Sequence, residues 1–145
     1  MKIAIASDHG GFELKSKLIE HYKNKDIQLA DLGTYSAESC DYPDIAEKMC
    51  QAILSGKHQT GILICGTGVG ISIAANRHKG IRAAILYDDD VARLAREHNN
   101  ANIAVFGGRT MKEEDVIRRL DIFLNTGFLG DRHLRRIEKL DREGE

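Results

Sequence analysis

Short apolar runs alternate along this chain with longer segments that have helical spacing. Five of these runs are predicted to be strands, over residues 2–7, 27–32, 61–64, 81–86 and 102–106. Because the runs are continuously apolar, we expect helices to cover both faces of the sheet that they form. Strands that alternate with helices form βαβ units and parallel sheets. The pattern predicts an α/β fold, a three-layer α/β/α sandwich around a five-stranded, parallel, Rossmann-like sheet.

Helical segments fill the intervals between the predicted strands. They are expected over residues 12–23, 45–54, 71–77, 90–98 and 113–124, with a polar loop over 36–44. After the last of them, residues 125–127 break the pattern, and a basic tail that we predict to be helical follows over about 130–145. A length of 145 residues is typical of one domain. We therefore expect a single domain over 1–145 that ends in this tail.

Composition excludes several classes of function. Apolar residues make up 42% of the sequence, charged residues make up 30%, and the formal net charge is −1. Such a chain folds, and it has no overall charge that would attract nucleic acid or a membrane surface. The three cysteines lack the spacing of a zinc site, and neither a signal peptide nor a membrane-spanning run is apparent. We expect a cytoplasmic protein with a small-molecule ligand and no nucleic-acid or membrane partner.

A glycine-rich turn follows the third apolar run. The turn contains Gly66, Gly68 and Gly70. It lies between Cys65, at the strand end, and a segment that is predicted to be a helix. Such a turn can direct several backbone N–H groups toward one anion, and the helix N-terminus adds positive potential. The spacing matches neither a Walker motif nor the G-x-G-x-x-G fingerprint. We favour an anion-binding turn over a turn without a ligand, because strand, turn and helix come in the required order.

Two interpretations of Cys65 are open on physical grounds. A free cysteine is most often a small buried apolar residue. A thiol at a strand end, beside a helix N-terminus, is instead held where the thiolate is favoured. This position favours a reactive thiol for Cys65, whereas Cys40 and Cys50 lack such a setting and are interpreted as structural.

Polar residues follow two other predicted strands. Ligands of parallel sheets bind at the carboxyl ends of the strands, so Asp8, His9 and Arg109 are expected at the same edge as Cys65. Asp8 suits a helix cap as well as a sugar hydroxyl, and His9 suits the protein surface as well as a ligand. Both alternatives stay open. The acidic run over 88–90 is interpreted as a loop and helix cap, and we predict no metal site.

The end of the fourth helix and the tail carry further candidates. His98 in a last helical turn complements the helix dipole, but histidine is also the side chain that most often moves protons near neutral pH. Arg132 and Arg136 could simply belong to a solvent-exposed face. They could equally bind a phosphate group, and so could Arg109.

Taken together, these segments resemble the ribose-5-phosphate isomerase B family, which includes the galactose-6-phosphate isomerase subunits and allose-6-phosphate isomerase. The matching pieces follow the family order along nearly the whole chain, at residues 7–11, 41–44, 64–76, 80–84, 96–102, 107–109, 132, 133 and 136. The most specific piece is Cys-Gly-Thr-Gly-Val-Gly-Ile-Ser-Ile-Ala-Ala-Asn over 65–76.

The resemblance implies a metal-independent aldose–ketose isomerase that acts on a sugar phosphate without a cofactor. It implies that Cys65 is the base that moves a proton between C2 and C1 through a cis-enediolate. Thr67 and His98 would open the sugar ring. The implied substrate-binding residues are Gly66, Gly68, Val69 and Gly70 in the turn, Asp8, His9 and Asn99 at the sugar, and Arg109, Arg132 and Arg136 at the phosphate. Family members are homodimers or dimers of dimers with sites shared between subunits, and the same assembly is expected here.

Two departures from the family pattern bear on mechanism and substrate. One branch uses a glutamate base where this chain has Ile71, which favours the cysteine mechanism. Asp131 takes the place of an expected second glycine, and its carboxylate could weaken contact with the phosphate. Three functions stay open: isomerisation of ribose 5-phosphate to ribulose 5-phosphate, the same reaction on a six-carbon sugar phosphate of the allose or galactose 6-phosphate type, and non-catalytic binding of a sugar phosphate. The presence of Cys65, Thr67 and His98 in one chain argues against the third.

Overall fold

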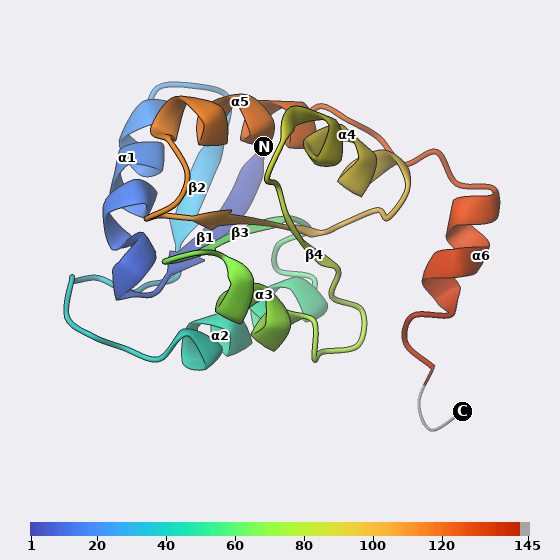
Figure 1. Cartoon of the computed structure of the whole chain (residues 1–145), viewed down its shortest axis with the longest axis horizontal. Helices are drawn as coiled ribbons and strands as arrows, with labels where there is room; N and C mark the ends of the chain where they lie inside the picture. Colours follow the sequence, from blue (N-terminus) through green and yellow to red (C-terminus); the bar gives the residue numbers. More distant parts are fainter. Residues whose placement is uncertain (143–145) are drawn as a thin grey trace.

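Five parallel strands form one sheet in the computed structural model, which describes residues 1–142. The strands are β1 (Lys2–Ser7), β2 (Gln28–Asp31), β3 (Gly61–Cys65), β4 (Ala83–Ile85) and β5 (Ile103–Gly107), in the spatial order β2-β1-β3-β5-β4 (Figure 1). The predicted α/β class and the five-stranded parallel sheet are confirmed. Because β3 lies between β1 and β5, the turn that follows β3 has a loop on each side.

Helices cover both faces of the sheet. On one face lie α1 (Phe12–Tyr22), α4 (Asp89–Glu97) and α5 (Glu113–Leu124), and on the other lie α2 (Tyr42–Leu54) and α3 (Val69–Ala75) (Figure 1). Successive side chains of a strand point to opposite faces. Ile64 accordingly packs in the cluster beneath α1, α4 and α5, and Cys65 belongs to the cluster beneath α2 and α3. No helix within residues 1–142 is long and apolar enough to span a membrane.

The ends of several elements differ from the prediction. Helix α2 begins at Tyr42, inside the segment predicted to be a polar loop. Pro43 lies in its first turn, where the missing N–H removes no helical hydrogen bond. Helix α3 begins at Val69 because Gly68, with a φ of 84°, makes the turn in the left-handed region. Strand β4 has three residues where six were expected, since it lies at the sheet edge and pairs only with β5.

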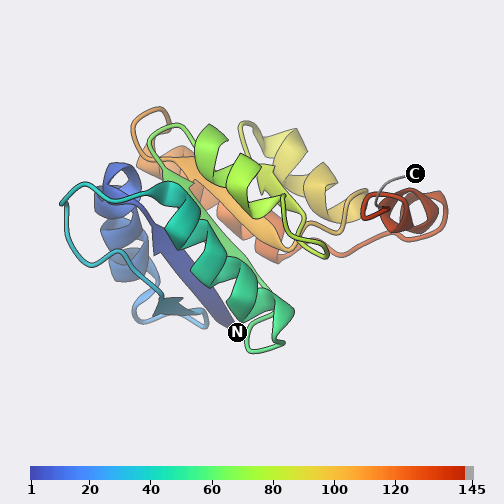
Figure 2. The same ribbon diagram turned by 90° about the horizontal axis from the view of Figure 1, so that it is seen from below.

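Helix α6 (Arg132–Glu138) lies within the tail that the sequence predicts to be helical, and the last residues of that tail, 143–145, fall outside the described part of the chain. Figures 1 and 2 show α6 standing apart from the sheet, far from the turn between β3 and α3. Leu129 N–H donates to Glu97 O at 3.1 Å, just before α6. Gly80 N–H donates to the Asp141 carboxylate at 3.0 Å, just after it. These contacts attach α6 to the end of α4 and to the segment before β4.

Candidate active site

The turn after β3 brings a thiol, a hydroxyl and backbone donors together. Cys65 is the last residue of β3 and is buried. Gly68 N–H donates to Cys65 Sγ at 3.2 Å, and Val69 N–H donates to Thr67 Oγ1 at 3.2 Å. Gly68 gives α3 no side-chain cap, so the remaining N–H groups of the first helical turn lack an intrahelical partner. The turn can therefore offer donors to an anion beside the thiol.

Close backbone contacts join this turn to the loops after β1 and β5. Gly108 N–H donates to Cys65 O at 2.8 Å, and Arg109 N–H donates to Gly66 O at 2.9 Å. A Cβ atom on Gly10 would lie 2.9 Å from Gly66 N, and one on Gly108 would lie 2.6 Å from Gly10 O. Only glycine permits so close an approach. The structure thus brings together the three strand ends that the sequence predicts to share one edge.

Asp8 and His9 lie beside this turn, and both already have backbone partners. Asp8 Oδ1 accepts hydrogen bonds from the N–H groups of two glycines at 2.9 and 3.3 Å, so the capping role considered for it is present. His9 Nδ1 accepts Cys40 N–H at 3.2 Å. The neutral His9 ring therefore carries its proton on Nε2 and can donate from there. His9 and Arg109 line one cavity of about 290 Å³.

Two side chains lie over opposite ends of the glycine-rich turn. A Cβ atom on Gly66 would lie 3.3 Å from Arg109 Nη1, and one on Gly70 would lie 2.7 Å from Tyr42 Cζ. Tyr42 was not among the predicted site residues, although the segment 41–44 belongs to the resemblance. Because this segment was predicted to be a loop, Tyr42 was not recognised as the first residue of a helix. The first turn of that helix faces α3.

A second group of predicted residues surrounds a different cavity. His98 and Asn99 at the end of α4, with Arg132 and Arg136 of α6, line a cavity of about 330 Å³. The ring of His133 also lines it and stacks on the ring of His98, with centroids 4.2 Å apart. Burial lowers the pKa of His133 below its ordinary value, and the neighbouring cationic groups lower it further. The sequence placed His133 in the basic tail without giving it a role.

The predicted residues therefore form two groups, which we call the Cys65 group (Asp8, His9, residues 65–70 and Arg109) and the His98 group (His98, Asn99, Arg132 and Arg136). Because β5 begins at Ile103, shortly after His98, the His98 group lies toward the amino edge of the sheet. The Cys65 group lies at the carboxyl edge. Figures 1 and 2 show the wide separation of α6 from the β3–α3 turn. One chain does not bring the two groups together.

The position of the alternative base and a second cysteine are both buried in the core. Ile71, at the position of the alternative glutamate base, is fully buried among α2 and α3. Burial raises the pKa of Cys50 to about 11, which fits the structural role expected for it. Within residues 1–142, no group of three or more His, Cys, Asp or Glu side chains could hold a metal ion.

Known proteins resemble this chain over nearly its whole length. A family model described as Ribose/Galactose Isomerase matches residues 3–140. The chain is 42% identical to ribose-5-phosphate isomerase B of Escherichia coli over 139 residues, which cover 96% of this chain and 93% of that protein. A ribose 5-phosphate isomerase structure from Thermotoga maritima is 57% identical, with a TM-score of 0.94 and 97% of both chains covered. Ribose-5-phosphate isomerase B of Clostridium thermocellum is 45% identical, with a TM-score of 0.94 and coverage of 97% of this chain and 95% of that one. The resemblance seen in the sequence is confirmed, and the chain belongs to the ribose/galactose isomerase family.

Proposed function

We propose that this protein interconverts ribose 5-phosphate and ribulose 5-phosphate, with Cys65 as the base. The relatives described above are named ribose-5-phosphate isomerases, which supports this choice of substrate. The observation that carries the chemistry is the position of Cys65 Sγ, which accepts Gly68 N–H at 3.2 Å at the start of a turn that presents further donors. Abstraction of a proton next to a carbonyl builds negative charge on oxygen, and prearranged N–H donors stabilise that charge without reorganisation.

The reaction moves one proton between carbons and one between oxygens. The Cys65 thiolate removes the proton from C2 of the open-chain aldose, the electron pair forms the C1–C2 double bond, and the C1 carbonyl oxygen takes the negative charge of a cis-enediolate. The proton of the C2 hydroxyl then passes to the oxygen on C1, the carbonyl forms at C2, and the thiol returns its proton to C1, which restores the thiolate. A positioned base of this kind contributes a factor of roughly 10² to 10⁴ in rate. No metal or cofactor takes part in the proposed steps.

The remaining residues bind and open the sugar. Thr67, in the same turn as Cys65, would act together with His98 in opening the furanose. Asp8, His9 and Asn99 would contact hydroxyl groups. The phosphate would be held by Arg132 and Arg136, with Arg109 contributing, because arginine presents paired donors that match phosphate oxygens. Arg132 and Arg136 line the same cavity as His98, which supports their assignment to one ligand.

The separation of the Cys65 group from the His98 group supports a shared site. We infer that the Cys65 group of one protomer faces His98 of the partner subunit, in a homodimer or a dimer of dimers. A twofold axis would then form two equivalent sites at one interface. The interface would also exclude water from the enediolate without a separate lid. We place this single-domain enzyme in the cytoplasm.

A panel of sugar phosphates tests the proposal. Rates of isomerisation of ribose 5-phosphate, allose 6-phosphate and galactose 6-phosphate are compared as kcat/KM. We expect ribose 5-phosphate to give the highest value and the Cys65→Ser variant to lose it. A higher value for a six-carbon substrate would replace the proposed substrate and keep the chemistry. Binding of all three without turnover would instead show a non-catalytic module.

A further inference from the structure

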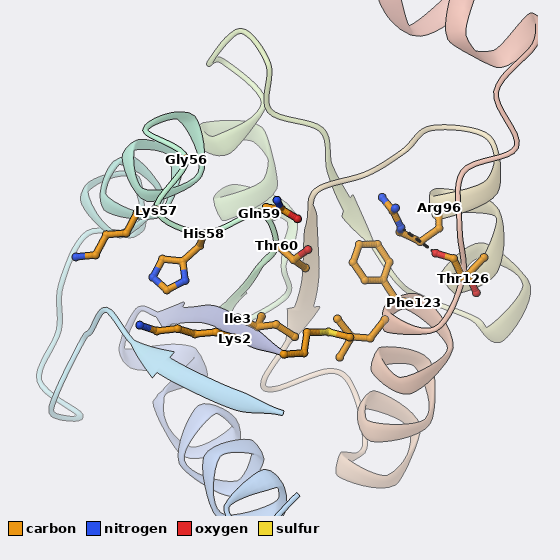
Figure 3. A pocket seen from close by; sticks show the side chains of 12 residues that line it. Lys2, Ile3, Gly56, Lys57, His58, Gln59, Thr60, Arg96, Phe123 and Thr126 are labelled. Atoms are coloured by element: carbon orange, nitrogen blue, oxygen red, sulfur yellow. Dashed lines mark hydrogen bonds between the residues drawn. The ribbon is translucent and has the colours of Figure 1, made fainter. Parts of the chain in front are cut away.

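A cavity of about 470 Å³ opens at the amino edge of the sheet, away from the glycine-rich turn (Figure 3). Its walls come from the start of β1, the segment that joins α2 to β3, the last turn of α4 and the end of α5. It shares no lining residue with the cavities around His9 or His98. The volume is in the range of sites for small metabolites. The proposed isomerase reaction leaves this cavity without a role.

The charge of the lining has one sign. Lys2, Lys57 and Arg96 line the cavity, and none of the lining residues is an aspartate or a glutamate. The Arg96 guanidinium donates to two backbone carbonyls and one side-chain amide, at 3.2, 2.7 and 2.8 Å, and all three acceptors are neutral. Burial and the charge of Arg82 lower the pKa of Arg96. Positive charge is thus concentrated here without carboxylates in the wall.

His58 is the buried polar side chain of this cavity. It is 4% exposed, and its Nδ1 has no hydrogen-bond partner among the described residues. Figure 3 shows its ring on the same side of the cavity as Lys2 and Lys57, with the end of Lys2 nearer to it. Burial and these two ammonium groups lower the pKa of His58. A buried polar group without a partner is uncommon in proteins and calls for an explanation. An anion between the two lysines would offset the positive charge that the ring now faces.

The opposite side of the cavity is less polar. Phe123 lines this side, and the Arg96 guanidinium lies 5.7 Å from the centroid of its ring (Figure 3). The Thr60 side chain lies between this side and the basic side. The cavity therefore combines a cationic end, a polar middle and an aromatic wall with a second cation beside it, which is the arrangement of a site for a small charged organic molecule.

We propose that this cavity is a second ligand site, which binds a small organic anion through a phosphate or carboxylate group held by Lys2, Lys57 and His58. The organic part of the ligand lies toward Arg96 and Phe123. Lysine ammonium groups bind either kind of oxyanion as point charges. Separate phosphate and carboxylate probes distinguish which of the two groups the cavity binds.

The test follows the imidazole resonances of His58 by NMR in the full-length protein. Inorganic phosphate, citrate, AMP and, as an uncharged control, adenosine are added at constant ionic strength. We expect saturable shifts of the His58 signals with at least one anion and none with adenosine. A response to phosphate and AMP identifies a phosphate site, and a response to citrate alone identifies a carboxylate site.

Matched variants locate the charge that binds. Lys2→Gln with Lys57→Gln should weaken the anion response of His58 about tenfold, since two partly solvated charge contacts are lost. Lys23→Gln with Lys48→Gln removes the same charge from exposed positions outside the lining and should leave the response unchanged. The signals of His98 and His133 report phosphate at the proposed isomerase site separately. The proposal is overturned if no anion gives a saturable His58 shift, or if both variant pairs weaken it equally.

Discussion

His98 and His133 stack face to face, with ring centroids 4.2 Å apart and an angle of 14° between the ring planes. His98 follows the last residue of α4, and His133 lies in the first turn of α6. The contact holds α6 against the end of α4 and places Arg132 and Arg136 around the ring proposed to be an acid and base. Because α6 stands far from the β3–α3 turn (Figure 1), we propose that another subunit completes this half of the site.

The stability of the fold should fall as the pH drops below about 6.5, the ordinary pKa of histidine. Burial and neighbouring cations lower the pKa of His58 and of His133 in the folded chain. The unfolded chain takes up these protons first, so the stability that the neutral rings provide is complete above about pH 6.5 and is lost on acidification through that value. Glu47 and Asp89 have lowered pKa values and lose their contribution only near or below about pH 4.5.

Thermal melts between about pH 7.5 and 5.5 check this expectation. The wild-type Tm should fall across the range, and the fall should be smaller in the variant with both His58→Gln and His133→Gln. His21→Gln, a change on α1, serves as the control and should follow the wild type. Parallel pH profiles for wild type and the double variant would contradict the assignment.

Replacement of Cys65 by serine should leave the fold intact and lower kcat by a factor of roughly 10² to 10⁴, because a hydroxyl is too weak a base near neutral pH. Cys40→Ser and Cys50→Ser are the matched controls and should keep their activity. The Cys50 thiol is buried on α2, and the backbone N–H of Cys40, rather than its thiol, contacts His9. Normal turnover by purified Cys65→Ser protein would remove Cys65 from the mechanism.

Substitution of Arg132 or Arg136 by alanine should raise KM about tenfold or more, since each removes charge-assisted hydrogen bonds to the phosphate. A smaller loss of kcat is expected as well, because phosphate binding also orients the reacting carbons. Arg135 lies on the same helix but does not line the cavity. Its alanine variant should behave as wild type, and equal effects of all three changes would indicate only a loss of general surface charge.

The backbone conformation of Asp131 gives a physical reason for a glycine at this position. Its φ of 53° and ψ of −125° lie in a region that glycine adopts far more readily than other residues. Asp131→Gly should therefore raise the free energy of unfolding by about 1 kcal/mol. It should also lower KM by removing a carboxylate next to Arg132. Asp131→Asn removes the charge without relieving the backbone, so it should lower KM alone. An unchanged KM in both variants would show that this carboxylate does not face the phosphate.

Much of the Cys65 group could be predicted because the carboxyl ends of parallel strands meet at one edge. The apolar runs marked the strands, and the polar residues and glycines marked their ends. The order of the strands could not be predicted, since a continuous apolar run carries no information about its neighbours. Tyr42 was missed for a related reason. Its position over Gly70 depends on the packing of α2 against α3, which local sequence does not determine.

The His98 group was only partly predictable. The arginines of the tail suggested a phosphate site, but their proximity to His98 depends on a stacking contact between residues far apart in sequence. His133 lies between Arg132 and Arg136 on one short helix, and this spacing is the signal that could have singled it out. His58 gave no signal, because its burial follows from the tertiary structure.

Mixing Cys65→Ser protein with His98→Asn protein decides whether sites are shared between subunits. In each mixed dimer, one site would combine the intact Cys65 group of one chain with the intact His98 group of the other, and the second site would carry both changes. After full subunit exchange, we expect about a quarter of the wild-type activity, from two individually inactive proteins. Cys65→Ser mixed with Arg109→Ala, both in the Cys65 group, should give no such gain. Absence of recovery after verified exchange, or an active monomer, would show that each chain builds its site alone.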